Sequence, residues 1–152
     1  IRGGGDLGDI WHEEGKKKLK KNTFLDYVAC ANHLINQKYT YKGGICFYGG
    51  SAGGLTGGAV ANMAPELFFS MLLLVPFVDT MTTMLNEKLP LTPSEWELWG
   101  NPIKNKEYFK YILSYSPYNN LDNRSYPPML ITTSIFDISP LASTVTLNFP
   151  FL

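Results

Sequence analysis

The stretch Gly49-Gly50-Ser51-Ala52-Gly53 contains the residue types that nucleophilic catalysis by a serine requires. A hydroxyl projected from a sharp strand-to-helix turn needs small neighbours, because larger side chains would clash with the backbone. Gly49 and Gly53 meet that need at the Gly-x-Ser-x-Gly spacing. In such a turn Ser51 would attack a carbonyl carbon, and the backbone N–H of Ala52 would face the charge developing on the oxygen. The pattern therefore predicts the nucleophile elbow of a serine hydrolase.

A glycine-rich stretch of this kind is also compatible with a phosphate-binding loop or with a structural turn. A P-loop would end in Gly-Lys-Ser/Thr, and a dinucleotide fingerprint would need Gly-x-Gly-x-x-Gly with an acidic residue about 20 positions later. Residues 49–54 match neither pattern. An apolar run precedes them and small residues follow them, which favours the elbow over both alternatives.

A serine nucleophile needs an acid and a base, which follow it in the order Ser, Asp or Glu, His in this type of hydrolase. Asp137 lies just beyond a predicted strand, where active-site residues of open parallel sheets gather, and is the candidate acid. A solvated loop aspartate is the alternative. The chain has two histidines, His12 and His33, and both precede Ser51. We therefore expect the base to be missing from this chain, which predicts negligible peptidase activity for it alone.

The elements expected to position these residues alternate between helix and strand. Apolar residues recur at three- and four-residue spacing from Thr23 to about Gln37, which predicts an amphipathic helix. The run 45–48 predicts a strand buried on both faces, and the small residues 52–64 predict a tightly packed helix. Further strands are expected at 71–75 and 129–133, and a short helix at 106–113. This alternation predicts an α/β fold with a mostly parallel sheet and flanking helices.

Charge and composition exclude several classes of function. Thirteen basic residues balance thirteen acidic ones, so no overall field would attract nucleic acid or an anionic membrane. The lysine-rich stretch 16–21 follows Glu13 and Glu14 and is interpreted as a solvated, mixed-charge loop, with a binding patch as the alternative. The longest apolar run, 71–78, is far shorter than the roughly 18 residues of a membrane span.

The two cysteines point to a reducing compartment. Cys30 and Cys46 lie in apolar sequence surroundings without a CxxC spacing or partnered histidines, so neither a disulfide framework nor a metal site is supported. We expect a cytoplasmic protein without a metal or an organic cofactor.

Several blocks in the same order resemble the prolyl oligopeptidase family of serine peptidases, within it the branch that cleaves after arginine or lysine. The blocks that carry this resemblance are Ile1-Arg2-Gly3-Gly4-Gly5, Asn22-Thr23-Phe24, Gly49-Gly50-Ser51-Ala52-Gly53-Gly54, Val75-Pro76-Phe77-Val78-Asp79, Trp99-Gly100-Asn101-Pro102 and Tyr115-Ser116-Pro117-Tyr118. The resemblance implies that residues 1–137 are part of an α/β-hydrolase catalytic domain, without the family's propeller and terminal histidine segment. Residues 138–152 depart from the family and are expected to be a divergent tail.

The resemblance also implies a substrate class. Glu95 and Glu97 are similar to the paired carboxylates that bind a basic side chain in this branch, and a guanidinium or ammonium group does need fixed negative charge in its pocket. Short peptides containing Arg or Lys are then the expected partners. A non-catalytic remnant that binds peptides, and an esterase or lipase on the same fold, stay open as alternatives. Exposed sheet edges would also invite self-association.

Overall fold

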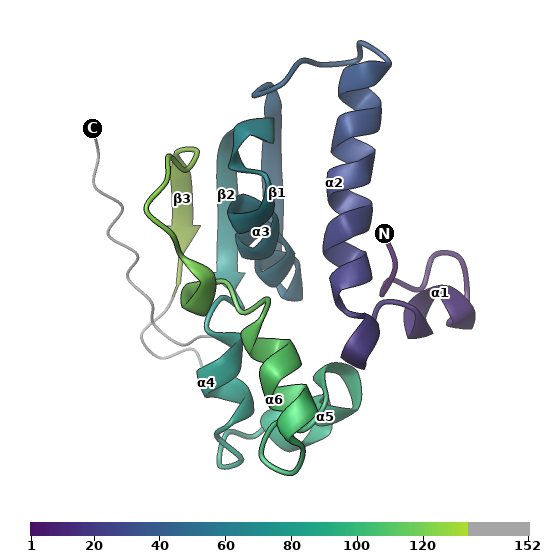
Figure 1. Cartoon of the computed structure of the whole chain (residues 1–152), viewed down its shortest axis with the longest axis vertical. Helices are drawn as coiled ribbons and strands as arrows, with labels where there is room; N and C mark the ends of the chain where they lie inside the picture. Colours follow the sequence, from purple (N-terminus) through teal and green to yellow (C-terminus); the bar gives the residue numbers. More distant parts are fainter. Residues whose placement is uncertain (134–152) are drawn as a thin grey trace.

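The computed structural model describes residues 1–133, in which three strands form one parallel sheet (Figure 1). The strands are β1 (Ile45–Ser51), β2 (Phe68–Pro76) and β3 (Met129–Thr132), in the order β1-β2-β3. β1 pairs with β2 through partners such as Phe47 and Met71, and β2 pairs with β3 from Met71 opposite Met129 onwards. The predicted α/β class and parallel sheet are confirmed.

Six α-helices and three short 3-10 turns accompany the sheet in the described part of the chain. They are α1 (Asp9–Glu13), η1 (Lys17–Leu19), α2 (Lys21–Asn36), α3 (Ala52–Met63), η2 (Pro65–Leu67), α4 (Thr80–Met84), α5 (Thr92–Trp99), α6 (Lys106–Leu113) and η3 (Tyr118–Asn120). The helices predicted at 23–37, 52–64 and 106–113 are confirmed, the last with the expected boundaries. No helix within residues 1–133 is long and apolar enough to cross a membrane.

Small residues allow α3 to pack closely on the sheet. A Cβ on Gly54 would lie 2.4 Å from the Cβ of Pro76, and one on Gly57 would lie 2.6 Å from the side chains of Leu73 and Phe47. Leu55 and other α3 residues are fully buried in the same contact. The predicted tight helix is confirmed, and its glycines fix how near α3 comes to the strands.

The expectation that β1 is buried on both faces is wrong in this structure. Burial alternates along the strand, with Phe47 3% exposed and Tyr48 69% exposed. Cys46 and Cys30 are also exposed, despite the apolar sequence around them. The cause is that α2 and α3 supply Phe24, Ala31, Leu55 and other core residues on the face to which Phe47 points. Successive side chains of a strand point to opposite faces, so Cys46 and Tyr48 point to the other face of the sheet and are exposed.

The lysine-rich stretch is not the solvated loop that its charge pattern suggested. It forms η1 and the start of α2, and it packs against α5 and α6. Lys16 pairs with Glu13, Lys17 with Glu97 and Lys18 with Glu107. Lys20 is buried, with its Nζ 4.9 Å from the centroid of the Trp99 ring. Lys16 thus has a local partner, whereas the partners of Lys17, Lys18 and Lys20 lie far along the chain, where local sequence could not indicate them.

The helices α4, α5 and α6 lie beyond the carboxyl ends of the strands, and the chain then returns to the start of β3 (Figure 1). The helix α5 was not expected, because Pro93 and its neighbouring prolines suggested irregular structure. Pro93 lies in the first turn of α5, where its missing N–H has no intrahelical acceptor and its fixed φ suits a helix start.

Candidate active site

Ser51 lies at the sharp junction of β1 and α3 in a strained backbone conformation. Its φ is 53° and its ψ −121°, a region that residues with a Cβ rarely occupy. Holding a non-glycine residue there costs on the order of 1–3 kcal/mol, and such strain persists where the surrounding structure enforces it. The predicted strand-to-helix turn with Ser51 at its apex is therefore present.

A β-bulge in the neighbouring strand helps to enforce this turn. Gly50 pairs with Leu74, whereas Ser51 pairs with Pro76, so that Val75 is the extra residue. Val75 itself has a φ of 44°, which is an outlier for a β-branched residue. Beyond the bulge, the backbone N–H of Phe77 donates a hydrogen bond to the carbonyl oxygen of Ser51 at 3.1 Å. Two strained residues on adjacent strands thus meet at the elbow.

The elbow glycines differ in what they contribute. A Cβ on Gly49 would lie 2.9 Å from the carbonyl oxygen of Gly53, so the turn closes only with glycine at position 49. Gly50 is tight against the Leu74 carbonyl oxygen, at 3.0 Å from its would-be Cβ. At Gly53 a Cβ would meet nothing within 4 Å. The elbow is therefore tight at Gly49, where the absence of a side chain lets the backbone of Gly53 approach. Position 53 itself has room for a side chain.

Ala52 is the first residue of α3, and its N–H is one of the helix's first donors that have no intrahelical acceptor. The residue is exposed, and Ser51 is partly so. The positive end of the α3 dipole also points at this corner. The arrangement has the features that a site for a developing oxyanion needs: a free backbone donor beside a projecting hydroxyl.

The two glutamates of α5 have different surroundings. The Oε2 of Glu95 accepts a hydrogen bond from Trp99 Nε1 at 2.9 Å, and Glu95 is partly buried. Glu97 is 86% exposed in its side chain, and its Oε2 lies 3.1 Å from Lys17 Nζ. Residues two apart on a helix do not face each other. The structure therefore directs the two carboxylates to different neighbours.

A chain of packing contacts connects Glu95 to the elbow. Trp99, which is hydrogen-bonded to Glu95, packs edge-on against Phe77 with the ring centroids 5.5 Å apart. Phe77 is fully buried, and its N–H is the donor to Ser51. Sequence reasoning did not assign a role to Trp99 or Phe77. The available signal was their place in the blocks Trp99-Gly100-Asn101-Pro102 and Val75-Pro76-Phe77-Val78-Asp79.

The remaining triad candidates are not brought together with Ser51 by the described residues. Asp137 lies outside residues 1–133, as does the expected divergent tail. The Nδ1 of His12 is 3.0 Å from the carbonyl oxygen of Gly3, and His33 is exposed on α2. Within residues 1–133 neither imidazole is hydrogen-bonded to Ser51.

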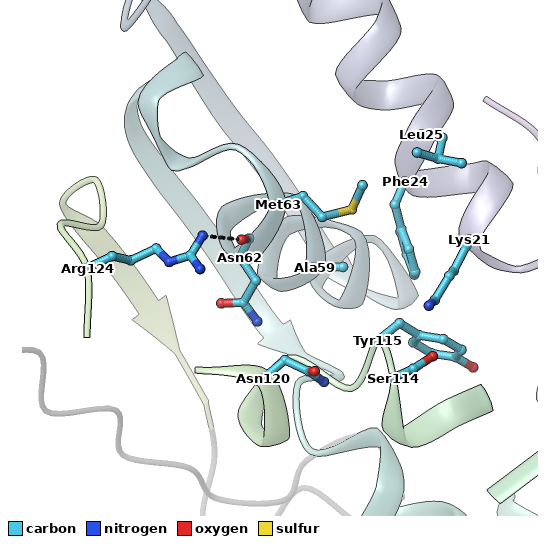
Figure 2. Close-up of a pocket in the computed structure, with 10 residues that line it drawn as sticks. All are labelled: Lys21, Phe24, Leu25, Ala59, Asn62, Met63, Ser114, Tyr115, Asn120 and Arg124. Atoms are coloured by element: carbon cyan, nitrogen blue, oxygen red, sulfur yellow. Dashed lines mark hydrogen bonds between the residues drawn. The ribbon is translucent and has the colours of Figure 1, made fainter. Parts of the chain in front are cut away.

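A cavity of about 350 Å³ opens between α2, α3 and the loop around residues 114–124 (Figure 2). Lys21, Phe24, Leu25, Ala59, Asn62, Met63, Ser114, Tyr115, Asn120 and Arg124 line it. Burial raises the pKa of Tyr115, whose hydroxyl has no hydrogen-bond partner within the described part of the chain. None of the lining residues belongs to the elbow or to α5, so this cavity is separate from the candidate active site.

Comparisons with known proteins agree with this geometry. The family model described as "Prolyl oligopeptidase family" matches residues 1–147. Protease 2 of Moraxella lacunata is 53% identical over 137 residues, which are 90% of this chain and 20% of that protein. Dipeptidyl aminopeptidase BI of Pseudoxanthomonas mexicana is 48% identical over the same share of this chain and 19% of its own length.

Solved structures give the same result. Oligopeptidase B from Leishmania major superposes with a TM-score of 0.87 at 46% identity, over 93% of this chain and 19% of that one. Oligopeptidase B from Trypanosoma brucei with covalently bound antipain gives a TM-score of 0.83 at 49% identity, over 86% of this chain and 18% of that one. The chain thus spans about a fifth of the length of these relatives. The family match, the relatives and the strained elbow together show that the chain belongs to the prolyl oligopeptidase family of serine peptidases.

Proposed function

We propose that this chain is part of the catalytic domain of an oligopeptidase B-like enzyme that cleaves short peptides after arginine or lysine, with Ser51 as the nucleophile. The observation that carries the proposal is the conformation of Ser51, whose φ of 53° at the strand-to-helix junction projects the residue from the turn. Strain of this kind is characteristic of functional sites, where it pre-organises a reactive group.

In the proposed reaction the Ser51 hydroxyl oxygen attacks the carbonyl carbon of the scissile peptide bond. The N–H of Ala52 stabilises the negative charge on the carbonyl oxygen, and removing one such donor typically costs 10²–10³ in kcat. Asp137 orients a histidine that takes the proton of Ser51 and then delivers it to the leaving amine. His12 and His33 are not assigned this role, because one is bonded to the Gly3 carbonyl oxygen and the other is exposed on α2.

The proposed preference for basic residues depends on α5. Glu95 and Glu97 place two carboxylates on this helix, and Glu95 is connected to Ser51 through Trp99 and Phe77. A cationic side chain that reaches α5 would meet the negative charge of these carboxylates, and the packed contacts hold α5 in a fixed position relative to Ser51. The T. brucei relative binds antipain covalently, which supports a covalent step in this family.

A chimera would test the proposal. Residues 1–133 would replace the aligned segment of the M. lacunata relative, and hydrolysis of arginyl and norleucyl peptide amides would be compared with the unmodified parent. We expect turnover of the arginyl substrate, a loss of at least roughly 10³-fold with Ser51→Ala, and a raised KM for arginine with Glu97→Gln. Glu66→Gln is the matched control, because this exposed glutamate pairs with Lys42 at 3.7 Å and lies on η2.

Two results would count against the assignment. Turnover that survives Ser51→Ala would exclude Ser51 as the nucleophile. Hydrolysis of simple esters in preference to arginyl amides would favour the esterase alternative. The isolated 152-residue chain should show negligible turnover in the same assay.

A further inference from the structure

Lys17 forms an ion pair with Glu97, one of the carboxylates that the proposed function assigns to binding the substrate's basic side chain. Its Nζ lies 3.1 Å from Oε2 of Glu97, on a different element and 80 positions away in the chain. The hydrogen bond to Glu97 also raises the pKa of Lys17 above the usual lysine value, which is itself well above neutral pH. An ammonium group of this chain therefore sits where a peptide's basic side chain is expected to bind.

The backbone at Lys17 supports a specific placement of that side chain. Lys17 has a φ of 49°, a conformation that non-glycine residues rarely adopt. The turn η1 that begins there packs against α5, while Lys18 on the same turn reaches a different helix and pairs with Glu107. The bend at Lys17 thus brings one lysine to α5 and the next to α6.

The ion pair is accessible enough to be exchanged. The side chain of Glu97 is 86% exposed and that of Lys17 is 36% exposed. Exposed pairs of this kind contribute about 0.2–1 kcal/mol, so an external cation can displace the lysine at small cost. A guanidinium group gains more than an ammonium from such a carboxylate, because it can donate two parallel hydrogen bonds.

We propose that Lys17 sets the affinity of this site for basic side chains: it is an internal competitor for Glu97 that a basic peptide side chain must displace. This inference rests on the proposed function, because it takes Glu97 as a substrate-binding carboxylate. It gives the lysine-rich stretch a role that the charge pattern alone did not suggest. The competition lowers the apparent affinity for every basic side chain by the same factor, the inverse of the fraction of Glu97 that is unpaired.

The test measures binding of Nα-acetyl-L-arginine amide to the 15N-labelled 152-residue chain by NMR, following the backbone amides of α5. All variants are made in the unmodified 152-residue chain, which is the parent and is expected to show negligible turnover. We expect Lys17→Met to tighten binding by roughly two- to fivefold, the factor that corresponds to an exposed ion pair. Lys18→Met removes the same charge one residue away and should leave the dissociation constant unchanged.

Three further samples separate the possible failures. Glu97→Gln should abolish saturable shifts, and Nα-acetyl-L-norleucine amide should cause none in the parent. Lys17→Gly removes the ammonium and also relieves the positive φ, so it should tighten binding even where Lys17→Met disturbs folding. If Glu97→Gln loses binding but neither Lys17 variant binds the arginine amide more tightly than Lys18→Met does, the competition between Lys17 and the ligand is refuted. Glu97 then remains the binding carboxylate. If Glu97→Gln binds as the parent does, the acidic site itself is refuted.

Discussion

The N–H of Phe77 donates a hydrogen bond to the carbonyl oxygen of Ser51 at 3.1 Å, directly after the β-bulge at Val75. This contact connects the end of β2 to the apex of the elbow. The hydrogen bond holds the carbonyl group of the strained Ser51, and the helix α3 begins at the next residue. The positions of the nucleophile candidate and of the Trp99–Glu95 pair are thereby coupled through one buried phenylalanine.

The strain at Ser51 predicts an unusual order of stability between two variants. Ser51→Gly should be more stable than Ser51→Ala by about 1 kcal/mol. Glycine adopts the positive φ without strain, and this gain outweighs the larger backbone entropy that glycine has in the unfolded chain. Urea unfolding followed by tryptophan fluorescence would measure the difference. An alanine variant as stable as the glycine variant would show that the turn relaxes without its serine.

The contact between α3 and β2 predicts a contrast between neighbouring glycines. Gly54→Ala should lower the free energy of unfolding by about 1–3 kcal/mol, since its Cβ would lie 2.4 Å from the Cβ of Pro76. Gly53→Ala is the matched control, because its Cβ would meet nothing within 4 Å. That change should be neutral or stabilise by up to about 1 kcal/mol through helix propensity. Equal effects in chemical denaturation would contradict the packing described for α3.

The ion pair between Arg2 and Asp26 predicts a pH dependence of stability. Arg2 donates to Asp26 from its backbone N at 2.8 Å and from its guanidinium Nε at 2.9 Å. These hydrogen bonds lower the pKa of Asp26 below 3.8. The stabilisation is therefore fully present above the unfolded-state pKa of about 3.9 and is lost as the pH falls through the lower folded-state pKa.

Asp26→Asn should accordingly cost about 1–3 kcal/mol at pH 7, and the gap to the unmodified chain should narrow below about pH 4. Asp122→Asn is the control, because Asp122 pairs with Arg124 at 2.7 Å in an exposed position. Its substitution should leave the stability nearly unchanged at both pH values, because the pair is exposed. A pH-independent gap for Asp26→Asn would attribute its effect to something other than ionisation.

Burial of Lys20 predicts a pH dependence of the same sign in an alkaline window, although here the charged form destabilises the fold. Burial lowers its pKa from 10.5 to about 8, so between these values the unfolded chain binds more protons and stability rises with pH. Lys20→Met should be stabilising at pH 7 by up to about 3 kcal/mol, an upper limit that the contact with Trp99 reduces. The advantage should shrink as the pH is raised from 8 to 10.5. Thermal unfolding of both chains across this range would measure it, and a constant difference would refute the buried charge.

The sequence by itself determined the parts of this protein that depend on short-range pattern. The elbow was predicted from the small residues around Ser51, the apolar run before it and the small-residue helix after it. The parallel sheet was predicted from three apolar runs separated by helical patterns. The predicted boundaries of α6 also agree with the structure, in which the Asn105 side chain caps the helix by accepting from the N–H of Glu107 and Tyr108.

The tertiary structure decided what depends on residues far apart in the chain. Which face of β1 is covered depends on α2 and α3, so alternation in burial could not be read from the four apolar residues 45–48. The bulge at Val75 exists only because β2 pairs with β1. Lys17 meets Glu97, and Lys20 meets Trp99, across about 80 residues of intervening chain. A run of lysines has the same local sequence whether it faces water or an acidic helix, and only folding brings that helix to it.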